Sequence, residues 1–151
     1  MKENKILNIL LADDDPDDRF FFQKALETLE FPTNLKMICD GEQLMGYLNQ
    51  CTDSLPDVLF LDLNMPRKNG SECLMEIKAN DKLKALRVVI YSTSLQEEIV
   101  NVLYRQGAHY YIRKCEFAQL KTLLRKVLTE MIEVKFVRPE RDEFVINLNK
   151  I

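Results

Sequence analysis

Residues 5–18, KILNILLADDDPDD, join a nearly continuous apolar run to a cluster of aspartates. An apolar run of this length without strict alternation is typical of a strand that is buried on both faces. Asp15 followed by Pro16 predicts a helix start, because Asp accepts hydrogen bonds at an N-cap and proline suits the first helical position. Asp17 and Asp18 then fall in the first helical turn, where the helix dipole favours negative charge. Capping thus accounts for these three aspartates, but less well for the two before them.

Four further apolar stretches predict buried strands, and an amphipathic segment follows each of them. The expected strands cover residues 34–39, 58–61, 87–91 and 109–113, and the expected helices cover residues 42–48, 71–79, 95–105 and 116–133. Buried strands that alternate with helices are typical of a parallel sheet with helices on both faces. The sequence therefore predicts a doubly wound α/β fold made of five βα units.

The composition is that of one ordinary globular domain. The chain has 151 residues, of which 46% are hydrophobic and 30% are charged. The formal net charge of −3 disfavours direct DNA binding, which needs a basic face. No apolar run approaches the roughly 20 residues of a membrane span, so no membrane insertion is expected. The first residues lack the pattern of a signal peptide, and we expect a cytoplasmic location.

The cysteines and the single histidine exclude several kinds of site. Cys39, Cys51, Cys73 and Cys115 form no C-x-x-C pair, and His109 is the only histidine. A structural zinc site needs closely paired ligands, so none is expected, and we interpret all four cysteines as reduced thiols. The four glycines are scattered, which excludes a glycine-rich phosphate loop.

Polar side chains follow four of the five predicted strands. Because ligands bind at the carboxyl ends of the strands in an open parallel sheet, these side chains should lie at one edge. They are Asp13 and Asp14, Asp62, Ser92 and Thr93, and Lys114. Any one of them alone is ordinary at a strand end. Their joint placement at one edge predicts a functional site.

The residue types at this edge indicate phosphoryl chemistry with a metal ion. Three clustered carboxylates repel one another unless a cation intervenes, and an oxygen-rich site with open positions suits Mg²⁺. A carboxylate beside the metal can act as a nucleophile and form an acyl phosphate. Asp62 is the best candidate nucleophile, and Lys114 and the Ser92 hydroxyl could bind the other phosphoryl oxygens.

The chain resembles the receiver domain of two-component response regulators of the chemotaxis CheY type. The matching segments are ILLADDDPDDR (9–19), PDVLFLDLNMPRKNG (56–70), VVIYSTS (88–94) and GAHYYIRK (107–114). They occur in family order, and the similarity spans roughly residues 5–133. The resemblance implies a five-stranded parallel sheet with the strand order 2-1-3-4-5, as in CheY and flavodoxin.

The resemblance also implies a role for each residue of the site. Asp62 would accept the phosphoryl group from a sensor histidine kinase or a phosphotransfer protein. Asp13, Asp14, Asp62 and the backbone carbonyl of Asn64 would hold Mg²⁺. The receiver would catalyse its own phosphotransfer and autodephosphorylation and would not be an enzyme with a separate substrate.

Ser92, Lys114 and Tyr111 match the family positions that respond to the phosphoryl group. Ser92 would bind it and couple it to movement, Lys114 would pair with it, and Tyr111 would turn inward as an aromatic switch. The chain departs from the family at Cys115, where receivers usually have proline. A cis bond before any other residue costs about 2.5–4 kcal/mol, so we expect a trans Lys114–Cys115 bond.

The resemblance predicts a stand-alone receiver domain over residues 1–134 and a C-terminal tail over residues 135–151. The tail is too short for a DNA-binding module, and its residues 144–146, Phe-Val-Ile, predict a short strand or a docked segment. The output would be onward phosphotransfer or a changed surface formed by residues 95–105, 109–113 and 116–133. The downstream target is not identified, and a homodimer is left open.

Two alternative functions use related chemistry or a related fold. An Asp-nucleophile, Mg²⁺-dependent phosphatase of the haloacid dehalogenase kind needs D-x-D-x-T after the first strand, where this chain has consecutive aspartates. A flavodoxin-like flavin-binding protein needs a Ser/Thr-rich phosphate loop at the same place, where aspartates would repel the phosphate.

Overall fold

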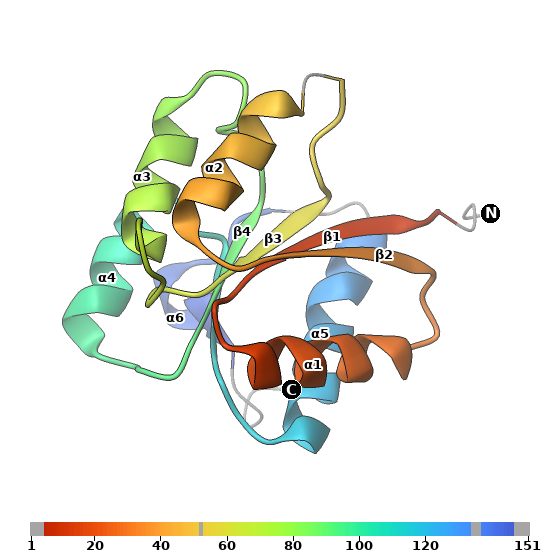
Figure 1. Cartoon of the computed structure of the whole chain (residues 1–151). Helices are drawn as coiled ribbons and strands as arrows, with labels where there is room; N and C mark the ends of the chain where they lie inside the picture. Colours follow the sequence, from red (N-terminus) through yellow and green to blue (C-terminus); the bar gives the residue numbers. More distant parts are fainter. Residues whose placement is uncertain (1–4, 52, 134–136, 147–151) are drawn as a thin grey trace.

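The computed structural model describes residues 5–51, 53–133 and 137–146, and its centre is one parallel sheet (Figure 1). Its strands are β1 (Leu7–Ala12), β2 (Thr33–Ile38), β3 (Val58–Leu61), β4 (Val88–Ser92), β5 (Tyr110–Arg113) and β6 (Val145–Ile146). Their order is β2-β1-β3-β4-β5-β6, with every neighbouring pair parallel. The predicted order 2-1-3-4-5 is confirmed, and a sixth strand extends the sheet.

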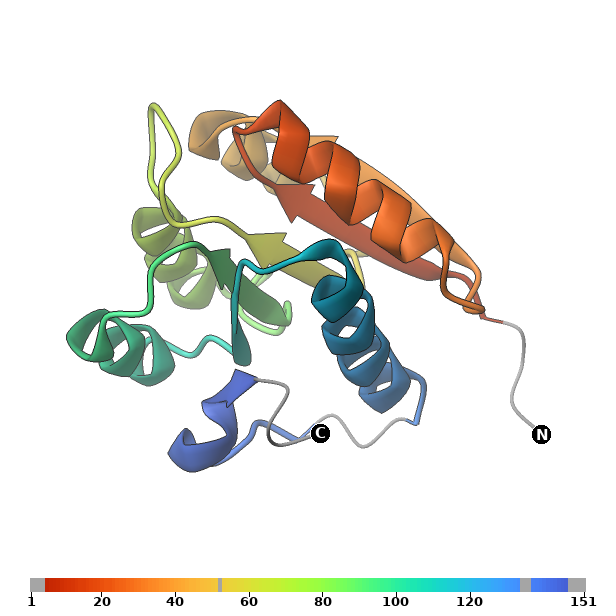
Figure 2. The ribbon, with the colours of Figure 1, turned by 90° about the horizontal axis from the view of Figure 1, so that it is seen from below.

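The helices lie in two layers, one on each face of the sheet (Figures 1 and 2). They are α1 (Pro16–Glu27), α2 (Gly41–Gln50), α3 (Gly70–Ala79), α4 (Glu97–Arg105), α5 (Phe117–Ile132) and α6 (Arg141–Phe144). Helices α1 and α5 pack on one face, and α2, α3 and α4 pack on the other. The doubly wound α/β arrangement expected from the alternating pattern is therefore confirmed.

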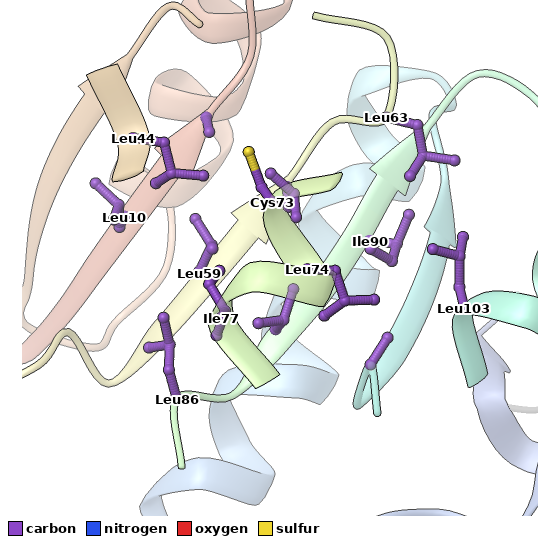
Figure 3. Packing of buried hydrophobic residues seen from close by; sticks show 14 of the residues in the cluster. Leu10, Leu44, Leu59, Leu63, Cys73, Leu74, Ile77, Leu86, Ile90 and Leu103 are labelled. Atoms are coloured by element: carbon purple, nitrogen blue, oxygen red, sulfur yellow. The ribbon is translucent and has the colours of Figure 1, made fainter. Parts of the chain in front are cut away.

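The core on the α2–α3–α4 face consists of interleaved aliphatic side chains (Figure 3). Leu59 and Ile90 point from the sheet toward Leu74 and Ile77 of α3, and all four are completely buried. Such packing holds β3 and β4 in fixed register, with Leu61 opposite Ile90. The residues that follow these strands are thereby placed at one edge of the sheet.

The start of α1 follows the predicted capping pattern. A side-chain oxygen of Asp15 accepts hydrogen bonds from the backbone N–H groups of Asp17 and Asp18. Pro16 occupies the first helical position. Helix α1 therefore begins directly beyond β1, and its first turn lies beside the acidic edge of the sheet.

Helix α4 begins two residues later than the sequence pattern predicts, and this is the largest correction to a helix start. Gln96 is its N-cap with an extended backbone, so Leu95 lies in the preceding loop. Glu97 and Glu98 then fall in the first turn, where the helix dipole favours them. Strand β4 in turn extends one residue further than expected and includes Ser92.

The C-terminal segment packs on α4 and β5 (Figure 2). Phe144 is fully buried, with its ring 5.1 Å from that of Tyr104 and 6.2 Å from that of Tyr111. Strand β6 then pairs with β5. The expected tail also includes residues 135, 136 and 147–151, which lie outside the described residues, and the domain boundary at residue 134 stays a prediction.

Two further expectations concern the backbone and membranes. The described residues contain no cis peptide bond, so the Lys114–Cys115 bond is trans, as the cost of a cis bond before a non-proline residue predicts. Within the same described residues, none of the helices has the length and apolar character needed to cross a bilayer.

Candidate functional site

Three aspartates converge at the carboxyl ends of β1 and β3. Asp13, Asp14 and Asp62 each place a carboxylate oxygen within 4.8 Å of the other two. The strands are neighbours, with Ala12 opposite Leu61, so the residues that follow them are brought side by side. Asp13 and Asp62 are buried, whereas Asp14 is exposed. The cluster is therefore open to solvent on one side only.

Burial makes the Asp62 carboxyl a weaker acid than an ordinary aspartate. Desolvation, together with the negative charges of Asp13 and Asp14, raises the pKa of Asp62 to about 7. The Lys114 ammonium and a hydrogen bond from the Asn64 backbone oppose this rise in pKa. Without a further cation, Asp62 is therefore only partly ionised near neutral pH.

Lys114 supplies the positive charge of the site. Its Nζ lies 2.8 Å from Asp13 Oδ2, 2.8 Å from Asp18 Oδ2 and 3.6 Å from Asp62 Oδ2. Burial lowers the pKa of Lys114, but the carboxylates outweigh it and leave that pKa above its ordinary value. Lys114 is therefore a permanent cation that faces the carboxylate cluster.

The donor set fits a hard divalent cation. Asp13 Oδ1 accepts a hydrogen bond from the Asp15 backbone N–H at 3.0 Å. Asp13 Oδ2 is buried and pairs with the Lys114 ammonium, whose Nζ lies 2.8 Å away. One ammonium offsets only part of the charge of three carboxylates that lie within 4.8 Å of one another, so their mutual repulsion favours a further cation. Asp13, Asp14 and Asp62 are therefore suited to hold a divalent metal ion.

Ser92 and Tyr111 form a second, more deeply buried part of the site. Ser92 ends β4, and its Oγ lies 3.4 Å from the Ser94 backbone N–H, which donates to it. The Tyr111 hydroxyl donates a hydrogen bond to the Ser94 carbonyl at 2.5 Å. Both Ser92 and Tyr111 are completely buried, so the tyrosine ring points inward in this structure. Thr93, also named from the strand-end pattern, is exposed.

The loop after Asp62 folds back tightly on the residue it follows. The Gly70 N–H donates to the Leu63 carbonyl at 2.9 Å. A Cβ added to Gly70 would lie 2.2 Å from the Asp62 carbonyl oxygen, closer than any real contact allows. Glycine is therefore required at the start of α3 by this close approach, and it helps to fix the Asp62 backbone.

Sequence reasoning missed one residue of the site. Helix capping alone accounts for Asp18 in the sequence pattern, yet its carboxylate accepts a hydrogen bond from Lys114 Nζ. The two residues are 96 positions apart, so only the fold brings them together. The sequence signal that was available is the position of Asp18 on the first turn of α1, directly beyond the strand that ends at Ala12.

Comparisons with known proteins agree with this geometry. The family described as response regulator receiver domain matches residues 9–127. Response regulator Rcp1 of Synechocystis sp. is 35% identical over 123 residues, which cover 79% of this chain and 82% of that protein. The crystal structure of the phosphorylated cyanobacterial phytochrome response regulator RcpA is 30% identical with a TM-score of 0.79, covering 90% of this chain and all of that one.

A second solved structure bears on the metal. The Mn²⁺-bound form of Rcp1 is 30% identical to this chain, with a TM-score of 0.76, and the match covers 89% of this chain and 99% of that one. The family match, these relatives and the acidic cluster agree on one identity. The chain belongs to the family of response regulator receiver domains.

Proposed function

We propose that Asp62 accepts a phosphoryl group from a phosphohistidine of a sensor histidine kinase, and that this changes the surface of the protein. Membership of the receiver family makes the chain a component of phosphorylation-dependent signalling with a histidine kinase as partner. The same membership decides against the phosphatase and flavodoxin alternatives. The observation that carries the proposal is the position of Asp62 between two carboxylates and the Lys114 ammonium.

The chemistry of the transfer follows from this arrangement. A carboxylate oxygen of Asp62 forms a bond to phosphorus while the phosphorus–nitrogen bond of the donor breaks. The electron pair of that bond stays on the imidazole nitrogen, which becomes neutral or takes up a proton. Lys114 is close enough to turn toward the transferred group and to offset the charge on its oxygens.

We infer that Mg²⁺ is the resident cation, held by Asp13, Asp14 and Asp62 with the Asn64 carbonyl as a further ligand. When bound, the cation would supply charge neutralisation at the phosphoryl oxygens and favour the ionised form of Asp62. The Mn²⁺-bound crystal structure of Rcp1 supports this choice, because Mn²⁺ and Mg²⁺ prefer similar oxygen ligands.

The response to phosphorylation would begin at Ser92. Its hydroxyl, at the end of the strand next to β3, would bind a phosphoryl oxygen and draw the following loop toward Asp62. The Ser94 carbonyl of that loop holds the Tyr111 hydroxyl, so movement of the loop alters the environment of the tyrosine. The surface formed by α4, β5 and α5 would carry the change.

The nucleophile is tested with Asp62→Asn, which keeps the shape and removes the reactive oxygen. Incubation with acetyl phosphate and Mg²⁺ should add one phosphoryl group to the wild type, measured by intact mass, and none to D62N. The matched control is Asp53→Asn, which changes an exposed loop carboxylate and should be labelled like the wild type. Equal labelling of D62N would overturn the assignment.

A further inference from the structure

We propose that Asp18 is a positioning residue that competes with the phosphoryl group for the Lys114 ammonium and so slows phosphorylation of Asp62. The inference rests on the proposed role of Asp62 as the phosphoacceptor. It concerns a residue that sequence patterns assign to helix capping alone. Asp18 acts through Lys114, and it lies outside the group of three carboxylates that could share a metal ion.

Lys114 lies as close to Asp18 as to Asp13, with 2.8 Å between Nζ and a carboxylate oxygen of each, and farther from Asp62. Lys114 Nζ lies 2.8 Å from Asp18 Oδ2, at hydrogen-bond distance, but 3.6 Å from Asp62 Oδ2. The lysine side chain is only 9% exposed, so its ammonium has few alternative partners in water. An ammonium has three donor hydrogens, and Asp18 occupies one of them.

The start of α1 holds Asp18 in place for this contact. The Asp18 backbone N–H is bound by the Asp15 side chain at 3.2 Å, which fixes the first turn of the helix. Arg19 Nη1 donates to the Asp13 carbonyl at 2.8 Å and ties the same turn to the end of β1. Asp18 therefore presents its carboxylate to Lys114 from a fixed backbone.

A metal ion held by the acidic cluster would not share the negative charge of Asp18. Among the described residues, the three carboxylates grouped closely enough to share a metal ion are Asp13, Asp14 and Asp62. A divalent cation there weakens the hold of Asp13 and Asp62 on the lysine, because it shares their charge. Asp18 keeps its full charge and becomes the main competitor for Lys114 when the site is loaded.

Removal of the Asp18 charge should therefore free Lys114 for the phosphoryl oxygens, on which negative charge is concentrated during transfer. The Asp18 carboxylate is 32% exposed, so solvent screens part of its attraction. We expect Asp18→Asn to raise the rate constant of phosphorylation by acetyl phosphate by about three- to tenfold.

Asp17→Asn is the matched control for this test. Asp17 lies on the same helical turn and is exposed, and no cation of the described chain lies within ion-pair distance of it. It therefore carries the same change in net charge and in helix-dipole interaction without a contact to Lys114. Its phosphorylation rate constant should stay within about 1.5-fold of the wild-type value.

A double-mutant cycle with Lys114→Gln separates a contact with the lysine from a general effect of charge. Asp18→Asn should have little effect on the phosphorylation rate when Lys114 is already glutamine. Calorimetric titration with Mg²⁺ should give the D18N protein a dissociation constant within about twofold of the wild type, because Asp18 is not a ligand.

The possible outcomes distinguish failure of the role of Asp18 from failure of the proposed function. A D18N rate equal to or below that of D17N, or a D18N effect that persists in K114Q, would overturn the role of Asp18. A large loss of Mg²⁺ affinity would assign Asp18 to the metal instead. If the wild type takes up no phosphoryl group on Asp62, the proposed function itself fails, which is a different result from equal rates in D18N and D17N.

Discussion

The acidic edge of the sheet and the C-terminal segment on α4 and β5 are built on opposite principles. At the edge, buried carboxylates face one lysine, and burial raises the pKa of Asp62 to about 7. In the C-terminal segment, Phe144 is buried between the rings of Tyr104 and Tyr111. The first region keeps like charges close together at a cost in stability, whereas the second stabilises the fold by apolar contact.

The largest expected effect is a loss of stability when Phe144 in the C-terminal segment is truncated. Phe144→Ala removes a completely buried ring and leaves a cavity, so the free energy of unfolding should fall by about 3–5 kcal/mol, measured by chemical denaturation. Val137→Ala, at a side chain that is 77% exposed, is the control and should change little.

The same variant tests whether the two regions are independent. Phe144 packs against Tyr104 and Tyr111 of α4 and β5, whereas the acidic cluster follows β1 and β3, so F144A should bind Mg²⁺ as the wild type does. Calorimetry on folded F144A decides this. A lost Mg²⁺ site would show that the C-terminal segment supports the carboxylates, and the contrast between the regions would be wrong.

Sequence patterns predict these two regions unequally well. Val58–Leu61 is a strand with the expected bounds, and Asp62 lies at its end, because a short apolar run between turn signals has one simple interpretation. The parallel-sheet rule then brings Asp13 and Lys114 to the same edge. Periodicity and strand ends thus predict most of the site.

The contacts that sequence reasoning could not supply join residues far apart in the chain. Apolar residues 144–146 indicate a segment that docks, but not that Phe144 meets Tyr104 and Tyr111, because the pattern carries no information on its partner. Asp18 was missed for a related reason. A sufficient local explanation, helix capping, hid its contact with Lys114.

The next largest effect is expected when a substitution displaces the backbone of Asp62 at the acidic edge. Gly70→Ala places a Cβ against the Asp62 carbonyl oxygen, with 2.2 Å between them before relaxation. The Asp62 backbone or the start of α3 must move, so unfolding should become easier by about 2–3 kcal/mol. Phosphorylation by acetyl phosphate should also slow.

Gly46→Ala is the matched control, because its added Cβ meets nothing within 4 Å and the residue lies within α2. It should be neutral or slightly stabilising, since alanine favours a helix. A Gly70→Ala protein with wild-type stability and phosphorylation rate would show that the loop after Asp62 yields easily, against the close fit described above.

A smaller effect, this time a gain in stability, is expected when the charge of Asp62 is removed. Because burial raises the pKa of Asp62 from 3.8 to about 7, the native state binds a proton that the unfolded chain has released in this range. The stability from this group is present below pH 4 and is lost as the pH rises through 7. In chelator, Asp62→Asn should therefore be more stable than the wild type by about 1–3 kcal/mol at pH 8.

The advantage of D62N should shrink as the pH is lowered from 8 to 5, where the wild-type carboxyl becomes protonated and neutral like the amide. Denaturation at a series of pH values measures this difference. Asp53→Asn, at an exposed carboxylate, should show no such trend. A D62N advantage that is constant with pH would mean that Asp62 is not destabilised by its charge.

The smallest effect concerns the exposed rim of the C-terminal contact. The Arg138 guanidinium stacks 3.9 Å from the centre of the Tyr104 ring, and its Nε donates to the Ala108 carbonyl at 3.0 Å. Solvent screens an exposed stack, so Arg138→Ala should cost about 0.5–1 kcal/mol of unfolding free energy. Arg138→Lys keeps the charge but not the planar stack, and it should recover less than half of the loss. Lys82→Ala, another exposed cation, is the control. A loss in R138A as large as that in F144A would show that the guanidinium anchors this segment as strongly as the buried ring does.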